Sequence, residues 1–202
     1  MTYGELKNRV LQLAFDYSLA GTAIPATYNN QADYIAMIPG LLNEAQTEIA
    51  TSHKRIYAQK ALSDFSEPSD FGSFLEYAYP ADCFEPFTNG LFETRTLMRH
   101  MPARYTPQSF LMPQTFPDGL VFEYWRYPEA VSSATADSTE LDNTLDVHEC
   151  LPYYVASRLL LYDDAYRAET LMDEYRQRVA KLRVAVWLEP QPILNRYSGE
   201  YN

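Results

Sequence analysis

Residues 168–186 read AETLMDEYRQRVAKLRVAV and carry the clearest periodicity in the chain. Apolar side chains recur at spacings of four and three residues, at Ala168, Met172, Tyr175, Val179, Leu182 and Val186. Charged residues fill the positions between them, with acids early and bases late, and this order complements the helix macrodipole. Proline at position 190 cannot continue a helix. The stretch therefore predicts a long C-terminal helix with one buried face.

Two helices are expected in the N-terminal part. The first begins at a capping box, Thr2-x-x-Glu5, and its apolar face is formed by Leu6, Val10, Leu13 and Tyr17. The second follows Asn29-Asn30 and has an apolar seam at Ile35, Ile38, Leu42, Ala45 and Ile49. Pro39 lies inside this seam, so we expect it to kink the helix or to mark its start.

A further helix is expected from Asp146, where another capping box precedes a face of Leu151, Val155, Leu159 and Tyr162. Together the four helices predict a core at the place where they meet. Its expected members are Leu42, Ile49, Leu159, Val179 and Leu182.

The middle of the chain has a different pattern, with frequent prolines and short aromatic runs. Strands are expected at residues 73–79 and 120–127, and weaker ones at 90–93 and 104–105. The predicted fold is mainly α: a four-helix bundle with a small β-rich insertion between the second and third helices and an extended C-terminal arm. The expected organisation is a helical pair at 1–55, the insertion at 56–128, an acidic flexible loop at 129–145, a second helical pair at 146–188, and the arm at 189–202.

Composition excludes several classes of protein. The chain has 202 residues, a net charge of -11 and 14% aromatic residues, so it is expected to fold and not to wrap nucleic acid. It contains no apolar run long enough to span a membrane and no signal-peptide pattern at its start. The two cysteines, Cys83 and Cys150, match no metal-ligand spacing and are expected to be packed thiols.

The sequence also carries no recognisable catalytic pattern. His53, His100 and His148 lie in three different elements without a ligand at metal-binding spacing. There is no glycine-rich phosphate loop and no nucleophile elbow. We therefore expect no catalytic residue, no metal, no cofactor and no enzymatic activity.

Two segments are candidates for binding a partner. Arg95, Arg99 and Arg104 form a basic cluster, which fits either contact with an acidic partner or a solvated loop rim. The C-terminal arm is too apolar for a solvating tail, and it is expected to become ordered on a partner or another subunit instead of fraying. Its candidate contact residues are Trp187, Pro190, Ile193, Leu194, Tyr197 and Tyr201.

Several stretches together resemble the head–tail connector (adaptor) proteins of tailed bacteriophages. The resemblance runs through the second helix at residues 33–50, YPADCFE at 79–85, FEYWRYP at 122–128, ECLPYYVASRLLL at 149–161 and the long last helix. It covers nearly the whole chain through diffuse patterns.

The resemblance implies a structural virion protein that forms a dodecameric ring under the portal at the head–tail junction. It implies contacts with the portal above and a tail or tail-hub protein below, DNA passing through the lumen without sequence-specific binding, no membrane, and synthesis in the cytoplasm of a bacterial host. Two alternatives stay open on the sequence: a free-standing helical protein-binding module with an acidic surface, and a small enzyme with its site in the β-rich insertion.

Overall fold

The computed structural model describes residues 1–15, 31–64, 66–70, 72–114 and 119–182. These residues fall into two compact units. The helical unit lies within residues 1–56 and 127–182, and the sheet unit lies within residues 57–126. The two units are described separately below.

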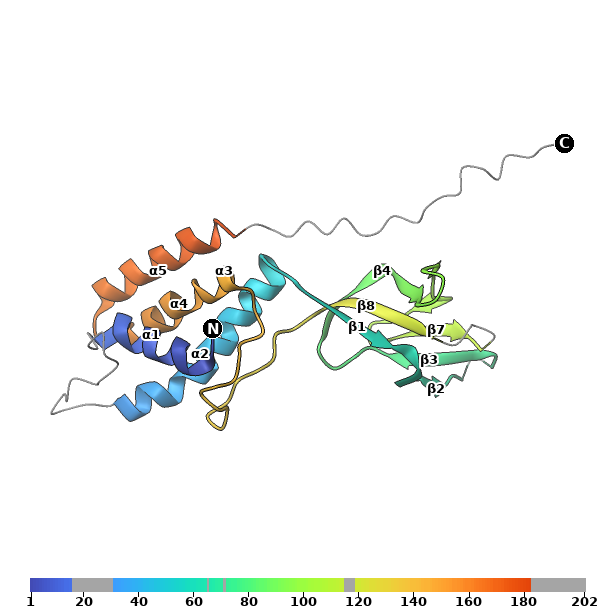
Figure 1. Ribbon diagram of the computed structural model, residues 1–202, viewed down its shortest axis with the longest axis horizontal. Coiled ribbons are helices and arrows are strands. Elements are labelled where there is room, and N and C mark those ends of the chain that lie inside the picture. Colours follow the sequence, from blue (N-terminus) through green and yellow to red (C-terminus); the bar gives the residue numbers. More distant parts are fainter. Residues whose placement is uncertain (16–30, 65, 71, 115–118, 183–202) are drawn as a thin grey trace. The chain divides into compact units, whose positions relative to one another are not determined.

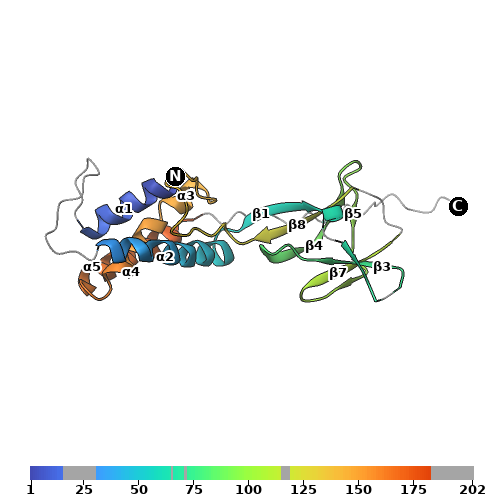
Figure 2. The same ribbon diagram turned by 90° about the horizontal axis from the view of Figure 1, so that it is seen from below.

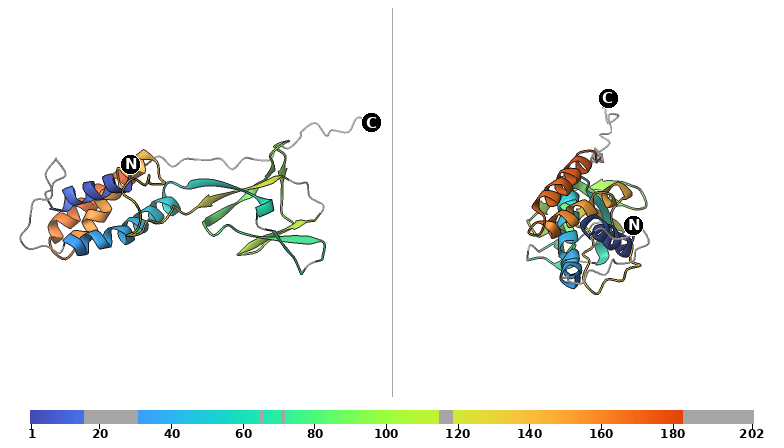
Figure 3. Two further views of the ribbon diagram at one scale, coloured as in Figure 1. Left: turned by 60° about the horizontal axis from the view of Figure 1, so that its bottom comes forward. Right: turned by 90° about the vertical axis from the view of Figure 1, so that its left-hand side faces the viewer.

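The described part of the helical unit contains five helices: α1 Tyr3–Phe15, α2 Gln31–Ser52, α3 Leu145–His148, α4 Leu151–Leu160 and α5 Ala165–Val179. Helix α4 packs against α1, α2 and α5 (Figure 1). The four longer helices run side by side along a common direction (Figure 3). The predicted capping box is present at α1, where Thr2 N donates to the Glu5 carboxylate and Glu5 N donates to Thr2 Oγ1.

The core of the helical unit confirms most of the predicted seam. Leu42, Ile49, Leu159 and Val179 are buried, and they pack in one cluster with residues of α1. Leu182 is only partly buried, because α5 ends at Val179 and Leu182 lies beyond its last turn. The prediction that Leu182 is enclosed is therefore wrong, and so is the prediction that the helical period continues unbroken beyond Val179.

The predicted third helix is divided into α3 and α4. Pro152 has no backbone N–H, so it is tolerated only in the first turn of a helix. The chain accordingly begins a new helix at Leu151, with Pro152 in its first turn. Helix α4 ends at Leu160, and Tyr162, which was expected on the buried face, is 94% exposed. Helix α5 then starts at the side chain of Asp164, which accepts a hydrogen bond from Arg167 N at 3.0 Å.

The acidic segment of the helical unit, residues 129–145, forms backbone and side-chain hydrogen bonds with α1 and α2 and with the first residues of the chain. Tyr3 N donates to Thr139 O at 2.8 Å, and Leu141 N donates to Met1 O at 3.1 Å. The side-chain amide of Asn43 exchanges two hydrogen bonds with the backbone of Val131, at 2.8 and 2.9 Å.

The described part of the sheet unit contains eight strands and one 3-10 turn, η1 Leu62–Asp64. The strands are β1 Ile56–Ala61, β2 Ser66–Pro68, β3 Phe74–Ala78, β4 Cys83–Glu93, β5 Arg99–His100, β6 Arg104–Tyr105, β7 Ser109–Pro113 and β8 Leu120–Arg126. They form two four-stranded sheets, in the orders β1-β8-β4-β5 and β2-β3-β7-β6 (Figure 2). Strands β2, β3, β7 and β6 pair antiparallel along the second sheet, and β4 pairs antiparallel with both β8 and β5 in the first.

Aromatic side chains fill the space between the two sheets. Phe122 of β8 and Phe110 of β7 stack with their ring centroids 5.0 Å apart, so aromatic rings of the two sheets are in contact. Tyr79 lies against both rings at 5.8 Å. The sheet unit is therefore a β-sandwich with its own core.

The prediction of a mainly α four-helix bundle with a small insertion is wrong, because the middle of the chain forms this separate β-sandwich. The strands expected at 73–79 and 120–127 are present as β3 and β8, and the weaker ones at 90–93 and 104–105 lie in β4 and β6. Strands β1, β2, β5 and β7 were not predicted, because they are short and several of the strands contain prolines. The prolines lie where sheets tolerate them: Pro68 and Pro113 are the last residues of β2 and β7, and Pro86 lies at a register shift of β4.

Candidate interaction surfaces

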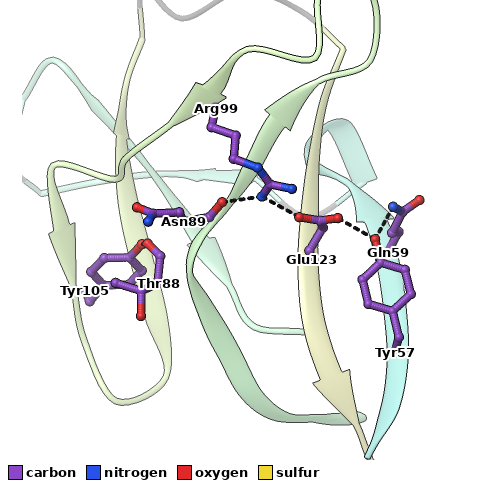
Figure 4. A network of polar contacts seen from close by, with 7 residues as sticks. All are labelled: Tyr57, Gln59, Thr88, Asn89, Arg99, Tyr105 and Glu123. Atoms are coloured by element: carbon purple, nitrogen blue, oxygen red, sulfur yellow. Dashed lines mark hydrogen bonds and ion pairs between the residues drawn. The ribbon is translucent and has the colours of Figure 1, made fainter. Parts of the chain in front are cut away.

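Arg99 of the predicted basic cluster belongs to a polar network inside the sheet unit (Figure 4). Its guanidinium lies 2.6 Å from the carboxylate of Glu123 and donates to Asn89 O, also at 2.6 Å. Glu123 is 6% exposed, so its charge is removed from water and needs this partner. The arginine thus neutralises a buried carboxylate of its own chain.

The other side of the same carboxylate accepts a hydrogen bond from Tyr57. The Tyr57 hydroxyl donates to Glu123 Oε1 at 2.5 Å and accepts a hydrogen bond from the Gln59 amide. Burial, and next the hydrogen bond to Glu123, raise the pKa of Tyr57 to about 12. Tyr57 therefore stays a neutral donor at physiological pH. The network joins β1, β8, β4 and β5 into one sheet.

A close backbone approach supports this network. A Cβ atom at Gly90 would lie 2.5 Å from the carbonyl oxygen of Glu123, so a side chain at this position would force β4 and β8 apart. Glycine thus allows β4 to pass close to β8 at its register shift. The neighbouring Asn89 carbonyl is the one that Arg99 binds.

The remaining two arginines of the cluster are exposed. Arg95 lies in the turn between β4 and β5, and Arg104 lies in β6. Their role differs from that of Arg99, whose guanidinium pairs with the buried Glu123 carboxylate. The sequence reasoning placed the three residues in one group because it had only their spacing.

Large apolar side chains are exposed around the same turn. Leu97 is 72% exposed, Met98 60% and Met101 64%. Large apolar residues that are exposed close together are typical of an interaction site. We call Arg95, Leu97, Met98 and Met101 the hairpin surface. Its apolar members were not predicted from the sequence. The signal available there was the absence of Asp and Glu from residue 94 to residue 114.

A second exposed apolar group lies on the helical unit, at the turn between α4 and α5. Tyr162 is 94% exposed, Tyr166 84% and Leu161 42%. Asp163 of this turn accepts a hydrogen bond from the Tyr34 hydroxyl of α2. We call Leu161, Tyr162, Asp163 and Tyr166 the helical tip surface.

A groove of about 540 Å³ runs along the helical unit beside α1 and α4. Charges of both signs line it, including Arg9, Glu149 and Arg178. The Arg178 guanidinium lies over the Tyr153 ring, 4.2 Å from its centroid. His148 lines the groove and is 4% exposed.

The burial of His148 has a pH consequence. Burial, and next the charge of the Met1 amino group, lower the pKa of His148 from its ordinary value of 6.5. Below that value the unfolded chain binds a proton that the folded chain does not, so the free energy of unfolding falls as the pH drops from about 6.5 towards the pKa of the folded state.

We expect His148→Gln to flatten this dependence between about pH 5 and 7, as measured by urea unfolding at a series of pH values. His53→Gln, which replaces a less buried histidine, is the control. A pH dependence identical to wild type in His148→Gln would contradict the assignment.

The six predicted contact residues of the arm, namely Trp187, Pro190, Ile193, Leu194, Tyr197 and Tyr201, lie outside the described residues. Cys83 is partly buried and Cys150 is buried, and both are free thiols, as predicted. Burial raises the pKa of each to about 11. In the described ranges, no cluster of three or more His, Cys, Asp or Glu side chains is arranged to hold a metal ion. Among the helices that the structure describes, none has the length and apolar character of a membrane span.

Comparison with known families gives one decisive match. The family model of the SU10 adaptor protein matches residues 1–192, which is almost the entire chain. The chain belongs to the SU10 adaptor family. This family consists of phage head–tail adaptor proteins, which confirms the resemblance seen in the sequence. The chain matches no curated protein.

Membership of the SU10 adaptor family establishes the general role. The protein is a phage adaptor, a structural component of the virion that interacts with other head or tail proteins. For such a protein the relevant sites are surfaces, and the hairpin surface and the helical tip surface are the two exposed apolar groups described above.

Proposed function

We propose that this SU10 adaptor forms a closed dodecameric ring under the portal, at the head–tail junction of the virion. In this position it joins the capsid to a downstream tail or tail-hub protein and extends the channel through which DNA leaves. The protein is made in the cytoplasm of the bacterial host and performs no catalysis. The observation that carries the proposal is the family match over residues 1–192.

The charge of the chain supports a place around the DNA channel. The net charge is -11, so its surface repels the phosphate backbone instead of binding it. Proteins that wrap nucleic acid need clustered Lys and Arg to release counterions. An acidic lumen lets DNA pass without sequence-specific contacts.

The distribution of exposed apolar residues supports a ring. A heterologous contact between identical subunits needs two different surfaces on each copy. Repetition of that contact closes a ring when the rotation between copies allows it. The hairpin surface lies on the sheet unit, and the helical tip surface lies on the helical unit. Each copy thus carries two unlike candidates for contact with other copies or proteins.

The contact with the portal is proposed to lie in the C-terminal arm, residues 189–202, together with Trp187. Pro190 bars continuation of a helix, and the arm offers spaced apolar anchors at Ile193, Leu194, Tyr197 and Tyr201. Ordering this segment has an entropic cost of about 1–2 kcal/mol per residue for the backbone, so the anchors must enter pockets on the partner.

The test is binding to the purified portal protein of the same phage, followed by sedimentation velocity. The wild-type protein is expected to join the portal as a ring-sized complex. Deletion of residues 190–202 is expected to abolish this attachment while leaving the melting curve of the isolated protein nearly unchanged. A wild-type protein that never joins the portal would contradict the proposed function. A truncated protein that joins normally would place the contact outside the arm.

A further inference from the structure

The hairpin surface is built on a strained backbone. Leu97 has a φ of +57°, a left-handed conformation that favours glycine and is uncommon for a bulky residue. Its N–H donates to Glu93 O at 2.8 Å and closes the turn. Glycine or asparagine at this position would relieve the strain. The chain instead has a leucine whose side chain is 72% exposed, so the folded subunit gains little burial in return.

The strained turn also forms hydrogen bonds along its length. Thr94 Oγ1 donates to Gly119 O at 3.1 Å, and Met98 N donates to Thr96 Oγ1 at 3.2 Å. Arg99, which follows directly, is fixed by the buried carboxylate of Glu123. A surface whose backbone is already ordered loses little entropy on binding. The exposed side chains of Leu97, Met98 and Met101 are therefore presented in a preorganised form.

The turn carries one exposed arginine, Arg95, and the carboxylate of Glu93, which accepts a hydrogen bond from the Thr96 hydroxyl. From residue 94 to residue 114 the chain has three arginines and no Asp or Glu, whereas the whole chain has 27 acids and 16 bases. Arg95 is exposed at the turn, whereas Arg99 is paired internally. Met and Arg are both enriched in protein–protein interfaces, so an exposed surface of Arg95, Leu97, Met98 and Met101 is typical of an interaction site.

The helical tip surface has the complementary chemistry. Tyr162 and Tyr166 are almost fully exposed, and Asp163 and Asp164 lie between them in the sequence. Exposed tyrosine rings accept contacts from methionine sulfur and from arginine guanidinium groups. The two carboxylates, which accept hydrogen bonds from the Tyr34 hydroxyl and from Arg167 N, carry charge opposite to that of Arg95. The helical tip surface thus offers aromatic rings and negative charge to a surface that contains methionine and arginine.

We propose that the hairpin surface of one copy docks on the helical tip surface of a neighbouring copy, with Leu97 and Met98 against Tyr162 and Tyr166. This contact is heterologous, because it joins two different surfaces, and its repetition generates a ring when the rotation between copies closes. The inference rests on the proposed ring function, and it assigns the subunit contact within that ring.

Cysteine cross-linking between two different copies tests the contact. One copy carries Leu97→Cys and the other carries Tyr162→Cys, both in a Cys83→Ser background; Cys150 is 1% exposed and stays in place. Because each copy has one engineered thiol, a disulfide between Leu97→Cys and Tyr162→Cys forms only between molecules. A mass tag on one copy separates the mixed dimer from dimers of like copies.

We expect the mixed disulfide to form at least about tenfold faster than the disulfide between Leu97→Cys and Leu145→Cys copies, because docking raises the effective thiol concentration. Leu145 is the matched control, since it is also on the helical unit and is 69% exposed. Addition of Arg95→Glu to the Leu97→Cys copy should slow the mixed reaction. Equal rates for the two pairs, or faster reaction with Leu145→Cys, would overturn the inference.

The same mixtures are examined with and without portal protein. This comparison distinguishes failure of the assigned subunit contact from failure of the proposed ring. If copies assemble on the portal but the Leu97→Cys and Tyr162→Cys pair shows no preference, the assigned contact is wrong and the ring stands. If the copies associate neither alone nor on the portal, both the contact and the ring are wrong.

Discussion

Replacing Arg99 by leucine is expected to destabilise the sheet unit by about 3–5 kcal/mol. The substitution leaves the Glu123 carboxylate buried without its cation, and an uncompensated buried charge is among the most costly single changes in a protein. Arg95→Leu, in the exposed turn four residues earlier, is the control and should change stability by less than about 0.5 kcal/mol.

The measurement is urea unfolding followed by the fluorescence of Trp125, which is 6% exposed in the sheet unit. A Trp187→Phe background removes the other tryptophan of the chain. In the double variant Arg99→Leu/Glu123→Leu, the loss should be smaller than the sum of the two single losses, because the orphan charge is gone. Equal stability of Arg99→Leu and Arg95→Leu would contradict the pairing of Arg99 with a buried carboxylate.

Phe122→Ala should destabilise the same unit by a similar amount, about 3–5 kcal/mol. Phe122 is 1% exposed and stacks on Phe110 and Tyr124, with ring centroids 5.0 and 5.4 Å apart. Its removal leaves a cavity between the two sheets that these flat rings cannot easily close. The loss is therefore that of a central core residue of the sandwich.

Val121→Ala is the matched control for this variant. Val121 is the preceding residue of β8, points to the opposite face of the strand, and is only partly buried. Unfolding of both variants is followed by Trp125 fluorescence in the same background. If Phe122→Ala and Val121→Ala shift the urea midpoint equally, the space between the sheets is not the core of this unit.

The helices were predictable because each long helix exposes one face to solvent and buries the other. The seam of α2 is an example: Ile38, Leu42, Ala45 and Ile49 are all 0% exposed, as their spacing indicated, whereas Ile35 in the first turns of the helix is 39% exposed, so its predicted burial is wrong. Helix ends were less predictable. The break before α4 depends on Pro152, and the end of α5 at Val179 has no proline or glycine to mark it.

The β-sandwich was not predictable as a separate unit. Strand β5 has two residues, and β7 is buried at four of its five positions, so neither shows the alternation of a half-buried strand. Strands far apart in the sequence also pair, such as β4 with β8, where the Phe87 and Trp125 rings lie 4.8 Å apart. Only β3 and β8 were long and aromatic enough to be expected as clear strands.

The candidate surfaces were predictable only in part. The excess of arginine around residue 99 is visible in the sequence, but the buried partner of Arg99 comes from β8, 24 residues away. Nothing in the sequence distinguishes Leu97 from the other apolar residues of the chain. Its positive φ and its exposure depend on how the turn between β4 and β5 closes, and the sequence contains no glycine there to announce it.

Cryo-electron microscopy of the head–tail junction in the intact phage particle measures most directly whether this adaptor forms a ring beneath the portal. We predict a closed ring of identical subunits coaxial with the portal, with density for residues 189–202 reaching the portal. The hairpin turn at Leu97 should lie against Tyr162 of the neighbouring subunit. A junction in which this protein is absent, or occupies isolated positions without contacts between its copies, would contradict the proposed function.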